Sequence, residues 1–311
     1  KEAKAGRKTN IKLAHITDTH VTFTGKNGTA LFKESFDIFR DVIGQINEMD
    51  DIDFILFGGD NINNTDPGTK GFDEFMNIMS GVRIPYFAQF GNREVSPIPP
   101  GIALSKNQYA EKMRGHGLDA SRYAWSVSPV QGLRILGLDT TIEGHDNGEI
   151  PEEELNWIKE ELAKYPNDMI VTLSHHLFLP TWGNRDIPKW KKKYLLKNYQ
   201  EVNAILDAAP QVKACLMGHH HVSKIQTVNG LHYIASPAAV QYPHAFRTIT
   251  INDNEARLQF HQVRDQKIIE MGTRNLLTSK NAEEYAGGSA GDILAYCHGG
   301  ESDNDVVLKL R

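Results

Sequence analysis

The stretch from Val212 to His221, which reads Val-Lys-Ala-Cys-Leu-Met-Gly-His-His-His, decides how this chain is expected to fold. Its apolar residues predict a buried strand, and the glycine after them predicts a sharp turn where the strand ends. On extended backbone, the side chains of His219 and His221 point to one side and that of His220 to the other. Two converging imidazoles fit half of a metal site, and a plain polar turn is the alternative.

Four further apolar runs end in polar residues in the same way. The predicted strands are residues 11–16, 52–57, 84–90 and 169–173. Helical periodicity between them predicts an α/β fold, in which the loops at the carboxyl ends of strands gather into one crevice. These loops would bring together Asp18, His20, Asp60, Asn92, His175, His219 and His221. Each cluster alone fits ordinary turn chemistry, but five together are hard to explain as turns.

Composition limits the classes of protein that fit. The chain has 311 residues, of which 40% are hydrophobic and 23% charged, as in an ordinary globular protein. Its net charge of -5 argues against a nonspecific nucleic-acid binder, and no apolar run is long enough for a membrane span. The two cysteines are too far apart in sequence to suggest a metal-binding pair or a disulfide framework. The chain begins at Lys1, which fits loss of an export signal or of a tag, so the compartment stays open. The oligomeric state cannot be read from the sequence either.

Domain boundaries are expected from composition and periodicity. Residues 1–10 are polar and basic and are expected to form a flexible arm. No linker divides residues 11–271, which are expected to form one domain whose last strand lies at 267–271. Periodicity fades beyond this point, and glycine-rich stretches predict a loosely structured C-terminal extension over 272–311.

The seven predicted ligands suit a particular kind of metal. Two Asp, one Asn and four His, without a thiolate, fit Mn, Fe or Zn and do not fit copper(I) or an iron–sulfur cluster. Seven ligands are too many for one tetrahedral ion and leave open positions if two ions share them. A carboxylate between two ions about 3.5–4 Å apart builds the clamp used for displacement at phosphorus. The ligand set therefore fits a centre of two divalent or trivalent ions that acts on a phosphoester.

These motifs resemble those of the calcineurin-like metallophosphoesterase superfamily. The matching motifs are Asp18-x-His20, Gly59-Asp60, Gly91-Asn92, His175 and Gly218-His219-x-His221. Their order and spacing match over roughly residues 11–252. The resemblance implies an α/β fold of four layers, an αββα sandwich of two mixed β-sheets flanked by helices. Features near Leu138-Asp139-Thr140-Thr141 also look like the bacterial cyclic-nucleotide phosphodiesterase branch.

The resemblance also implies a role for each predicted ligand. One ion would be held by Asp18, His20 and His221, the other by Asn92, His175 and His219, and Asp60 would bridge the two. The attacking group would be a metal-bound hydroxide. His175 is preferred as a ligand because it directly follows its strand, and His176 is the alternative.

The chain departs from the family at Arg93, where the family usually has His. Arg cannot act as a general acid near neutral pH, but its guanidinium can clamp a phosphate oxygen with two hydrogen bonds. The alternative is that Arg93 pairs with Glu94 or another carboxylate and leaves the site. If a general acid is needed, the candidates are His145, His176 and His220.

Four functions fit these residues, and the first is a phosphodiesterase acting on a cyclic nucleotide or another small phosphodiester. Arg93, together with the loop that contains Trp182 and Trp190, favours a pyrophosphatase acting on a nucleotide-sugar or lipid conjugate as the second. A phosphomonoesterase is the third, and a non-catalytic scaffold that binds metal or phosphate is the fourth. Because all seven ligand types are present, an enzyme is preferred, with Asp60, Asn92 and Arg93 as its expected catalytic residues.

Overall fold

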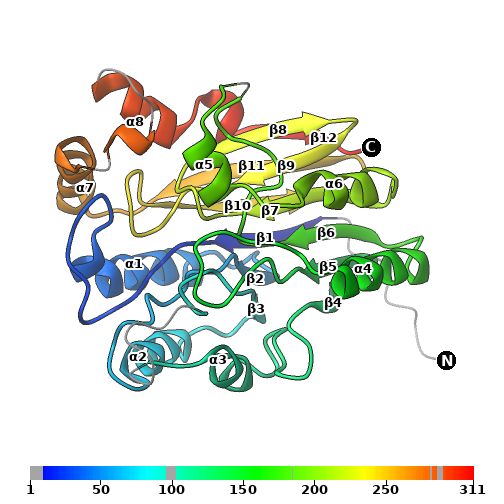
Figure 1. Cartoon of the computed structure of the whole chain (residues 1–311), viewed down its shortest axis with the longest axis horizontal. Helices are drawn as coiled ribbons and strands as arrows, with labels where there is room; N and C mark the ends of the chain where they lie inside the picture. The colour runs from blue at the N-terminus through cyan, green and yellow to red at the C-terminus, as the bar shows by residue number, and fades with distance from the viewer. Residues whose placement is uncertain (1–9, 96–102, 184, 281, 286–289) are drawn as a thin grey trace.

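The structure, a computed structural model, consists of two six-stranded β-sheets with helices around them (Figure 1). It describes residues 10–311 apart from 96–102, 184, 281 and 286–289. The predicted arm over residues 1–10 therefore lies, except for Asn10, outside the described residues. The strand order is β12-β11-β10-β1-β2-β3 in the first sheet and β4-β5-β6-β7-β9-β8 in the second.

Strands and helices are interspersed along the first two thirds of the chain. The strands are β1 (Ile11–Ile16), β2 (Phe54–Phe57), β3 (Tyr86–Ala88), β4 (Trp125–Val130), β5 (Leu133–Gly137), β6 (Met169–Leu173), β7 (Val212–Met217), β8 (Lys224–Val228), β9 (Leu231–Ala235), β10 (Ala245–Ile251), β11 (Glu255–Gln262) and β12 (Val306–Lys309). The α-helices are α1 (Ser35–Asn47), α2 (Lys70–Met79), α3 (Lys106–Lys112), α4 (Glu152–Lys164), α5 (Pro188–Tyr194), α6 (Tyr199–Asp207), α7 (Gln266–Thr278) and α8 (Ala290–His298). No helix in the described part of the chain has both the length and the apolar character needed to cross a membrane.

Strand register places the ends of the central strands at one edge of the molecule. In the first sheet β1 and β2 are parallel, with Ile16 beside Phe57. In the second sheet β6 and β7 are parallel, with Leu173 beside Leu216. Within each sheet, the two parallel strands therefore end at the same level, and the loops that follow them start side by side. The sequence predicts this arrangement for the site.

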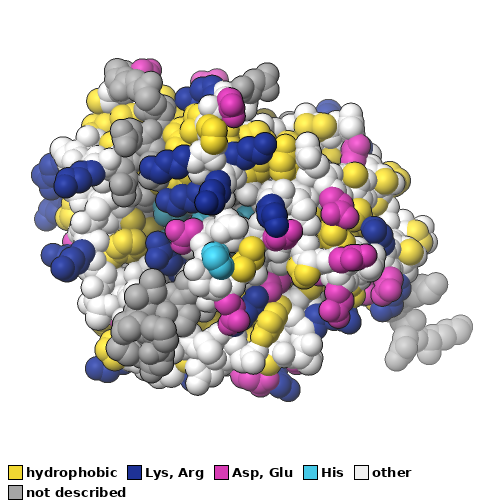
Figure 2. Space-filling model, in the orientation of Figure 1, with side chains coloured by type: hydrophobic (Ala, Val, Ile, Leu, Met, Phe, Trp, Pro, Cys, Tyr) yellow, Lys and Arg dark blue, Asp and Glu magenta, His cyan; other side chains and the backbone are white. Residues whose placement is uncertain are grey.

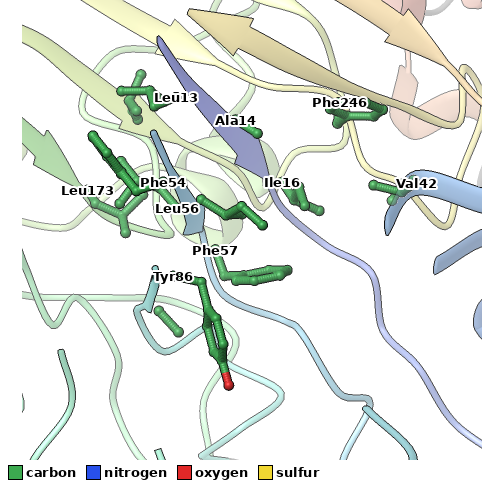
Figure 3. Packing of buried hydrophobic residues seen from close by; sticks show 14 of the residues in the cluster. Leu13, Ala14, Ile16, Val42, Phe54, Leu56, Phe57, Tyr86, Leu173 and Phe246 are labelled. Carbon is green, nitrogen blue, oxygen red and sulfur yellow. The ribbon is translucent and has the colours of Figure 1, made fainter. Parts of the chain in front are cut away.

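The core explains why these apolar runs form strands. All four residues of β2 are buried, as expected for a strand that is covered on both faces. Leu13 of β1, Phe54 of β2 and Leu173 of β6 belong to one buried cluster, so side chains from both sheets meet between them (Figure 3). The same cluster includes the buried face of α1, while α4 and α6 pack against the second sheet in another cluster. The predicted fold class, an α/β sandwich of two mixed sheets flanked by helices, is confirmed.

The C-terminal part of the chain differs from expectation. The strand predicted at 267–271 is wrong, because these residues lie in α7, whose first turn is capped by the Asp265 carboxylate accepting from the Lys267 amide. Its buried residues Ile268, Gly272 and Leu276 recur every four positions, which is helical spacing. The expected boundary at 271 thus falls inside a helix.

The extension over 272–311 is not loosely structured where the structure describes it. It contains the end of α7, a short 3-10 helix η2 (Ala282–Tyr285), α8, a second 3-10 helix η3 (Glu301–Asp303) and β12. The strand β12 pairs with β11 at the edge of the first sheet. The sequence did not predict these elements because they are short and interrupted by glycines, so they show no long apolar periodicity. Their order comes from packing against the rest of the molecule. The glycines 287 and 288 lie outside the described residues.

Candidate metal centre

Most of the predicted ligands sit on backbone with a positive φ angle. The φ angles are 54° at Asp18, 43° at His20, 51° at Asp60, 68° at His219 and 58° at His221. Residues other than glycine rarely adopt this left-handed conformation, and such strain concentrates at functional sites. The sequence argument assumed extended backbone at His219 and His221, and this assumption is wrong. At these five positions, in the loops after β1, β2 and β7, the turn directs the side chain toward the other candidate ligands.

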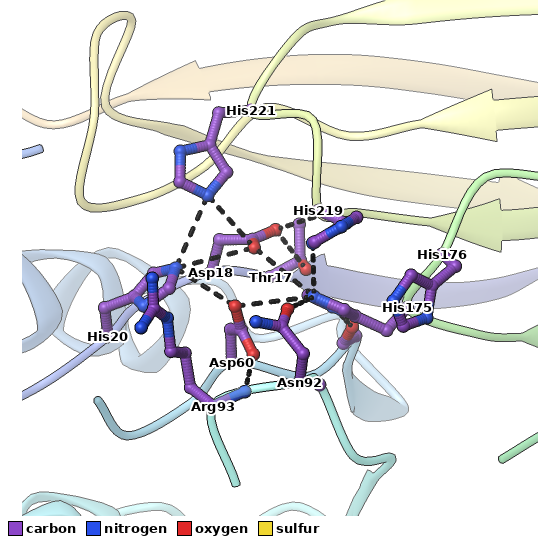
Figure 4. Close-up of polar contacts among 12 residues, drawn as sticks. Thr17, Asp18, His20, Asp60, Asn92, Arg93, His175, His176, His219 and His221 are labelled. Atoms are coloured by element: carbon purple, nitrogen blue, oxygen red, sulfur yellow. Dashed lines mark hydrogen bonds and ion pairs between the residues drawn. The ribbon is translucent and has the colours of Figure 1, made fainter. Parts of the chain in front are cut away.

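The turns bring six carboxylate and imidazole side chains into two groups. One group is Asp18, His20 and His221, and the other is Asp60, His175 and His219. Within each group, one possible ligand atom from every residue lies within 4.8 Å of the others. All six are buried or nearly so, and they come from loops of both sheets (Figure 4).

Asp60 lies between the two groups. Its Oδ2 atom is 3.4 Å from His20 Nε2 in one group and 3.4 Å from His175 Nε2 in the other. Asp18 Oδ1 is 3.2 Å from His221 Nε2 and 4.0 Å from His175 Nε2. The two groups are thus neighbours on either side of the Asp60 carboxylate.

Each aspartate is held through one oxygen and presents the other. Asp18 Oδ2 accepts hydrogen bonds from Thr17 Oγ1 at 2.7 Å and from the His219 amide at 3.0 Å. Asp60 Oδ1 accepts from the Arg93 amide at 2.7 Å. The remaining oxygens, Asp18 Oδ1 and Asp60 Oδ2, face the histidines. A side chain at Gly91 would collide with Asp60 Oδ1, which explains why glycine precedes Asn92.

Three of the four histidines are oriented through the ring nitrogen that faces away from the site. His175 Nδ1 lies 2.9 Å from the Gly58 carbonyl oxygen, and His219 Nε2 lies 2.9 Å from the Lys193 carbonyl oxygen. His221 Nδ1 lies 3.1 Å from Gln241 Oε1. A nitrogen that faces an acceptor carries the proton, so the lone pair of the other nitrogen points into the site.

Asn92 completes the second group. Its Oδ1 atom is 3.2 Å from His175 Nε2, while its amide nitrogen donates to Asp146 Oδ1 at 3.1 Å. Asp146 therefore fixes which end of the amide faces the cluster. Asp146 was missed as a functional residue because it lies in a loop without any motif.

Arg93 is placed in the site, and its predicted alternative partner is not available. The Glu94 carboxylate accepts from the amides of Asp60, Ile62 and Gly91 at 2.7–3.0 Å. The alternative that pairs Arg93 with Glu94 is therefore wrong. The Arg93 side chain instead lines the cavity beside the histidines and makes no ion pair within the described part of the chain (Figure 4).

Electrostatics show that the cluster attracts positive charge. Burial alone would lower the pKa of His175, but the carboxylates of Asp60 and Asp18 outweigh it and raise that pKa to about 9. Burial would likewise raise the pKa of Asp18, yet the histidines, His221 first, hold it well below the usual range. For His20 and His219 burial outweighs these carboxylates and lowers the pKa of each ring. A bound cation would balance the two buried carboxylates.

The donor set fits a dinuclear metal centre. Asp18 Oδ1 is buried without a hydrogen-bond partner in the described structure, although buried polar atoms are nearly always paired. A metal ion is a partner that would satisfy an unpaired carboxylate oxygen facing imidazole nitrogens. Oxygen and imidazole nitrogen donors without thiolates suit Mn, Fe or Zn, so the residues present fit the predicted ions.

The site opens into a cavity of about 210 Å³. Besides predicted ligands, it is lined by Arg93, Lys193, Asp146 and three aromatic residues, Phe32, Tyr194 and Tyr285. Lys and Arg side chains gather over α5, and histidine side chains are visible beneath them (Figure 2). The cavity wall thus combines the cationic side chains of Arg93 and Lys193 with the carboxylates of Asp60 and Asp146 and with aromatic rings.

The other three histidines proposed from the sequence lie elsewhere. His176 is buried, with its ring nitrogens 2.7 Å from Thr140 Oγ1 and 3.1 Å from the Asp146 carbonyl oxygen, so both are engaged. His220 is buried among aromatic rings, with Nδ1 2.6 Å from Thr181 Oγ1. His145 is exposed. None of the three lines the cavity, and His175 rather than His176 faces the cluster.

Comparison with known proteins places this geometry in a family. The calcineurin-like phosphoesterase family matches residues 11–223, which include all the predicted ligands. The chain is 28% identical over 229 residues to a 3′,5′-cyclic adenosine monophosphate phosphodiesterase, CpdA, of Haemophilus influenzae, covering 73% of this chain and 76% of that protein. It is 26% identical over 256 residues to CpdA of Escherichia coli K12, covering 81% of this chain and 86% of the relative.

Solved structures agree with this placement at the level of the fold. A dimetal phosphatase from Danio rerio superimposes with a TM-score of 0.65 at 16% identity, covering 82% of this chain and 97% of that one. Two mixed sheets, candidate ligands in the loops after their strands and a family match over more than half of the sequence all lead to one conclusion. The chain belongs to the calcineurin-like phosphoesterases, a family of metal-dependent phosphoester hydrolases.

Proposed function

We propose that this protein is a dinuclear metal-dependent phosphodiesterase. The observation that carries the proposal is the position of Asp60 Oδ2, 3.4 Å from one histidine of each ligand group, at the floor of one cavity. In this proposal Asp18, His20 and His221 hold one ion, and His175, His219 and Asn92 hold the other, with Asp60 shared. When bound, two such ions supply Lewis acidity and lower the pKa of a water molecule.

The chain's own residues bind and orient the substrate. The Arg93 guanidinium, which has no ion-pair partner among the described residues, is available to clamp the phosphate oxygens of a bound ester. Lys193 lines the same cavity and adds positive charge. Phe32 packs against His20 and Tyr194 against His219, so each ligand group has an aromatic neighbour.

A 3′,5′-cyclic nucleotide is the preferred substrate class. Two relatives are named as phosphodiesterases of 3′,5′-cyclic adenosine monophosphate, and a third, from Mycobacterium tuberculosis, is named as a dual-specificity cAMP/cGMP phosphodiesterase. A ring-bearing monoanion also matches the cavity, because aromatic faces and cationic side chains line it together.

Turnover of bis(p-nitrophenyl) phosphate with added Mn²⁺ tests the proposed activity. The wild type is expected to hydrolyse this diester, and Asp60→Ala to lose at least about a hundredfold in kcat, because both ions lose a shared ligand. Asp37→Ala, on the exposed face of α1, is the matched control and should act like the wild type. Absence of turnover with each of Mn, Fe and Zn would overturn the proposal.

A pyrophosphatase is the second candidate, and the Arg93 side chain in the cavity is the observation that favours it. A fixed cation suits a doubly charged pyrophosphate diester, whose phosphate leaving group needs little protonation. A poorer leaving group would need a general acid, and none of His145, His176 and His220 lines the cavity. The two activities are separated by comparing kcat/KM on cyclic AMP with kcat/KM on a nucleotide-sugar pyrophosphate. A larger value on the pyrophosphate selects the second candidate.

A further inference from the structure

We propose that Gln241 is a positioning residue for His221, and that the C-terminal extension acts on the metal centre through it. The proposal rests on the ligand set given above, in which His221 holds one of the two ions. It concerns a residue in the loop between β9 and β10 and a tyrosine in η2, both of which lie beyond the segment that matches the family.

His221 differs from the other oriented histidines in the kind of acceptor behind it. His175 and His219 face main-chain carbonyl oxygens, which no substitution removes. His221 Nδ1 faces a side-chain oxygen, Gln241 Oε1, at 3.1 Å. Gln241 is fully buried and lines the cavity, so its side chain cannot turn freely into solvent. The orientation of one predicted ligand therefore depends on a single side-chain amide.

The direction of that amide decides which nitrogen of His221 can bind a metal. With Oε1 toward the ring, Nδ1 carries the proton and donates it, and Nε2 keeps a lone pair directed at Asp18 Oδ1, 3.2 Å away. The reverse direction would make Nδ1 the acceptor and put the proton on Nε2, which would exclude a metal there. Gln241 thus selects the tautomer of His221 that is competent to bind.

The C-terminal extension supports this direction. The Tyr285 hydroxyl, in η2, donates to the same Gln241 Oε1 at a distance of 3.5 Å. Tyr285 is buried and also lines the cavity, so the extension forms part of the cavity wall. His221 Nδ1 and the Tyr285 hydroxyl thus both lie on the Oε1 side of the amide, while Gln241 Nε2 is buried without a hydrogen-bond partner in the described structure. The extension is thereby linked to the ion held by Asp18, His20 and His221.

This arrangement predicts an effect on one ion only. In the described structure the hydrogen bonds of the Gln241 side chain go to His221 and Tyr285 and to none of Asp60, His175 and His219. His175 and His219 keep their main-chain acceptors. Loss of an acceptor behind a metal-binding histidine typically costs about 10–100-fold in metal affinity. Substitution of Gln241 should therefore lower the affinity for one ion and leave the affinity for the other unchanged.

Calorimetric titration of the metal-free full-length protein with Mn²⁺ tests the inference without any assay of turnover. The wild type should bind two ions per chain. Gln241→Met, which keeps the volume and removes the acceptor, should bind one ion as the wild type does and the other at least about tenfold more weakly. Gln241→Glu keeps an acceptor oxygen and should restore both affinities. Tyr285→Phe should weaken the same ion by a smaller factor.

Tyr296→Phe is the matched control, because its hydroxyl also lies in the extension but contacts Thr181, which is not a predicted ligand. It should bind both ions normally. Wild-type affinities in Gln241→Met, equal weakening of both ions, or failure of Gln241→Glu to restore binding would each overturn this inference alone. A wild type that binds no ion would overturn the proposed ligand set as well.

Discussion

At the scale of single residues, one polar atom of a candidate ligand makes a hydrogen bond that holds the side chain in place. A second polar atom of the same side chain then faces the site. Asp18 and Asp60 each commit one oxygen to main-chain amides and present the other to the histidines. His175 and His219 each commit one nitrogen to a carbonyl group. Because these supports are main-chain groups fixed by the fold, the geometry of the ligands exists before any substrate arrives.

The role of Arg93 leads to a prediction about catalysis. Arg93→Ala should lower kcat/KM for bis(p-nitrophenyl) phosphate by about a hundredfold, because a charged donor to the phosphate is lost, while the number of bound ions stays at two. Arg93→Lys should recover part of the loss, since it restores charge but not the two-pronged geometry. The measurement is steady-state kinetics with Mn²⁺, with the exposed Arg83→Ala as control. Full activity in Arg93→Ala would place the guanidinium outside the reaction.

The sequence predicts the ligands better than it predicts their supports. Asp18, Asp60 and His175 follow apolar runs directly, so strand prediction alone places them at one edge. Gln241 and Asp146 are distant in sequence from the side chains they orient, and no local pattern marks them. Their roles arise from tertiary packing, and the positive φ angles of the ligands are likewise imposed by it.

A buried histidine outside the site leads to a prediction about pH. Burial lowers the pKa of His244 to about 4, so the folded protein keeps this ring neutral while the unfolded chain protonates it near pH 6.5. Its contribution to stability is present above pH 6.5 and is lost as the pH falls toward 4. At pH 5 the loss amounts to about 2 kcal/mol.

His244→Asn removes the titrating ring and suits the positive φ of 54° at this position. Between pH 7 and pH 5 the free energy of unfolding should fall in both proteins, and the fall should be about 2 kcal/mol smaller in the variant than in the wild type. Urea unfolding of metal-free protein at both pH values measures the difference, with the exposed His145→Asn as control. An unchanged pH dependence in His244→Asn would contradict the assignment.

At the scale of elements, α7 shows why the end of the chain was mispredicted. Its buried face includes a glycine, Gly272, where a strong apolar signal would otherwise appear. A side chain at Gly272 would collide with the His244 ring, which precedes β10. Close packing of the helix on this loop requires the glycine, and the same glycine weakens the helical pattern in the sequence.

Two glycine substitutions in helices should therefore have opposite effects. Gly272→Ala should destabilise the protein by about 1–3 kcal/mol, because the added methyl group overpacks the contact with His244. Gly44→Ala, in α1, meets no atom within 4 Å and should stabilise it by about 0.5–1 kcal/mol through helix propensity. Urea unfolding measures the change in the free energy of unfolding of each variant. Destabilisation of equal size in both would show that packing at Gly272 is not the cause.

At the scale of the whole molecule, the candidate centre lies where the two sheets meet. Asp18, His20 and Asp60 follow strands of the first sheet, while His175, His219 and His221 follow strands of the second. Each ligand group takes residues from both sheets. The sandwich fold therefore brings the candidate ligands of the two sheets together, and neither sheet alone supplies a full set.

The most direct test of the central claim is the number of Mn²⁺ ions bound per chain at which hydrolysis of 3′,5′-cyclic AMP reaches its maximum. Metal-free protein would be titrated with Mn²⁺ while bound metal and the initial rate are measured on the same samples. A dinuclear centre predicts little activity with one ion per chain and a maximum at two. Full activity after metal removal, or a maximum at one ion, would contradict it.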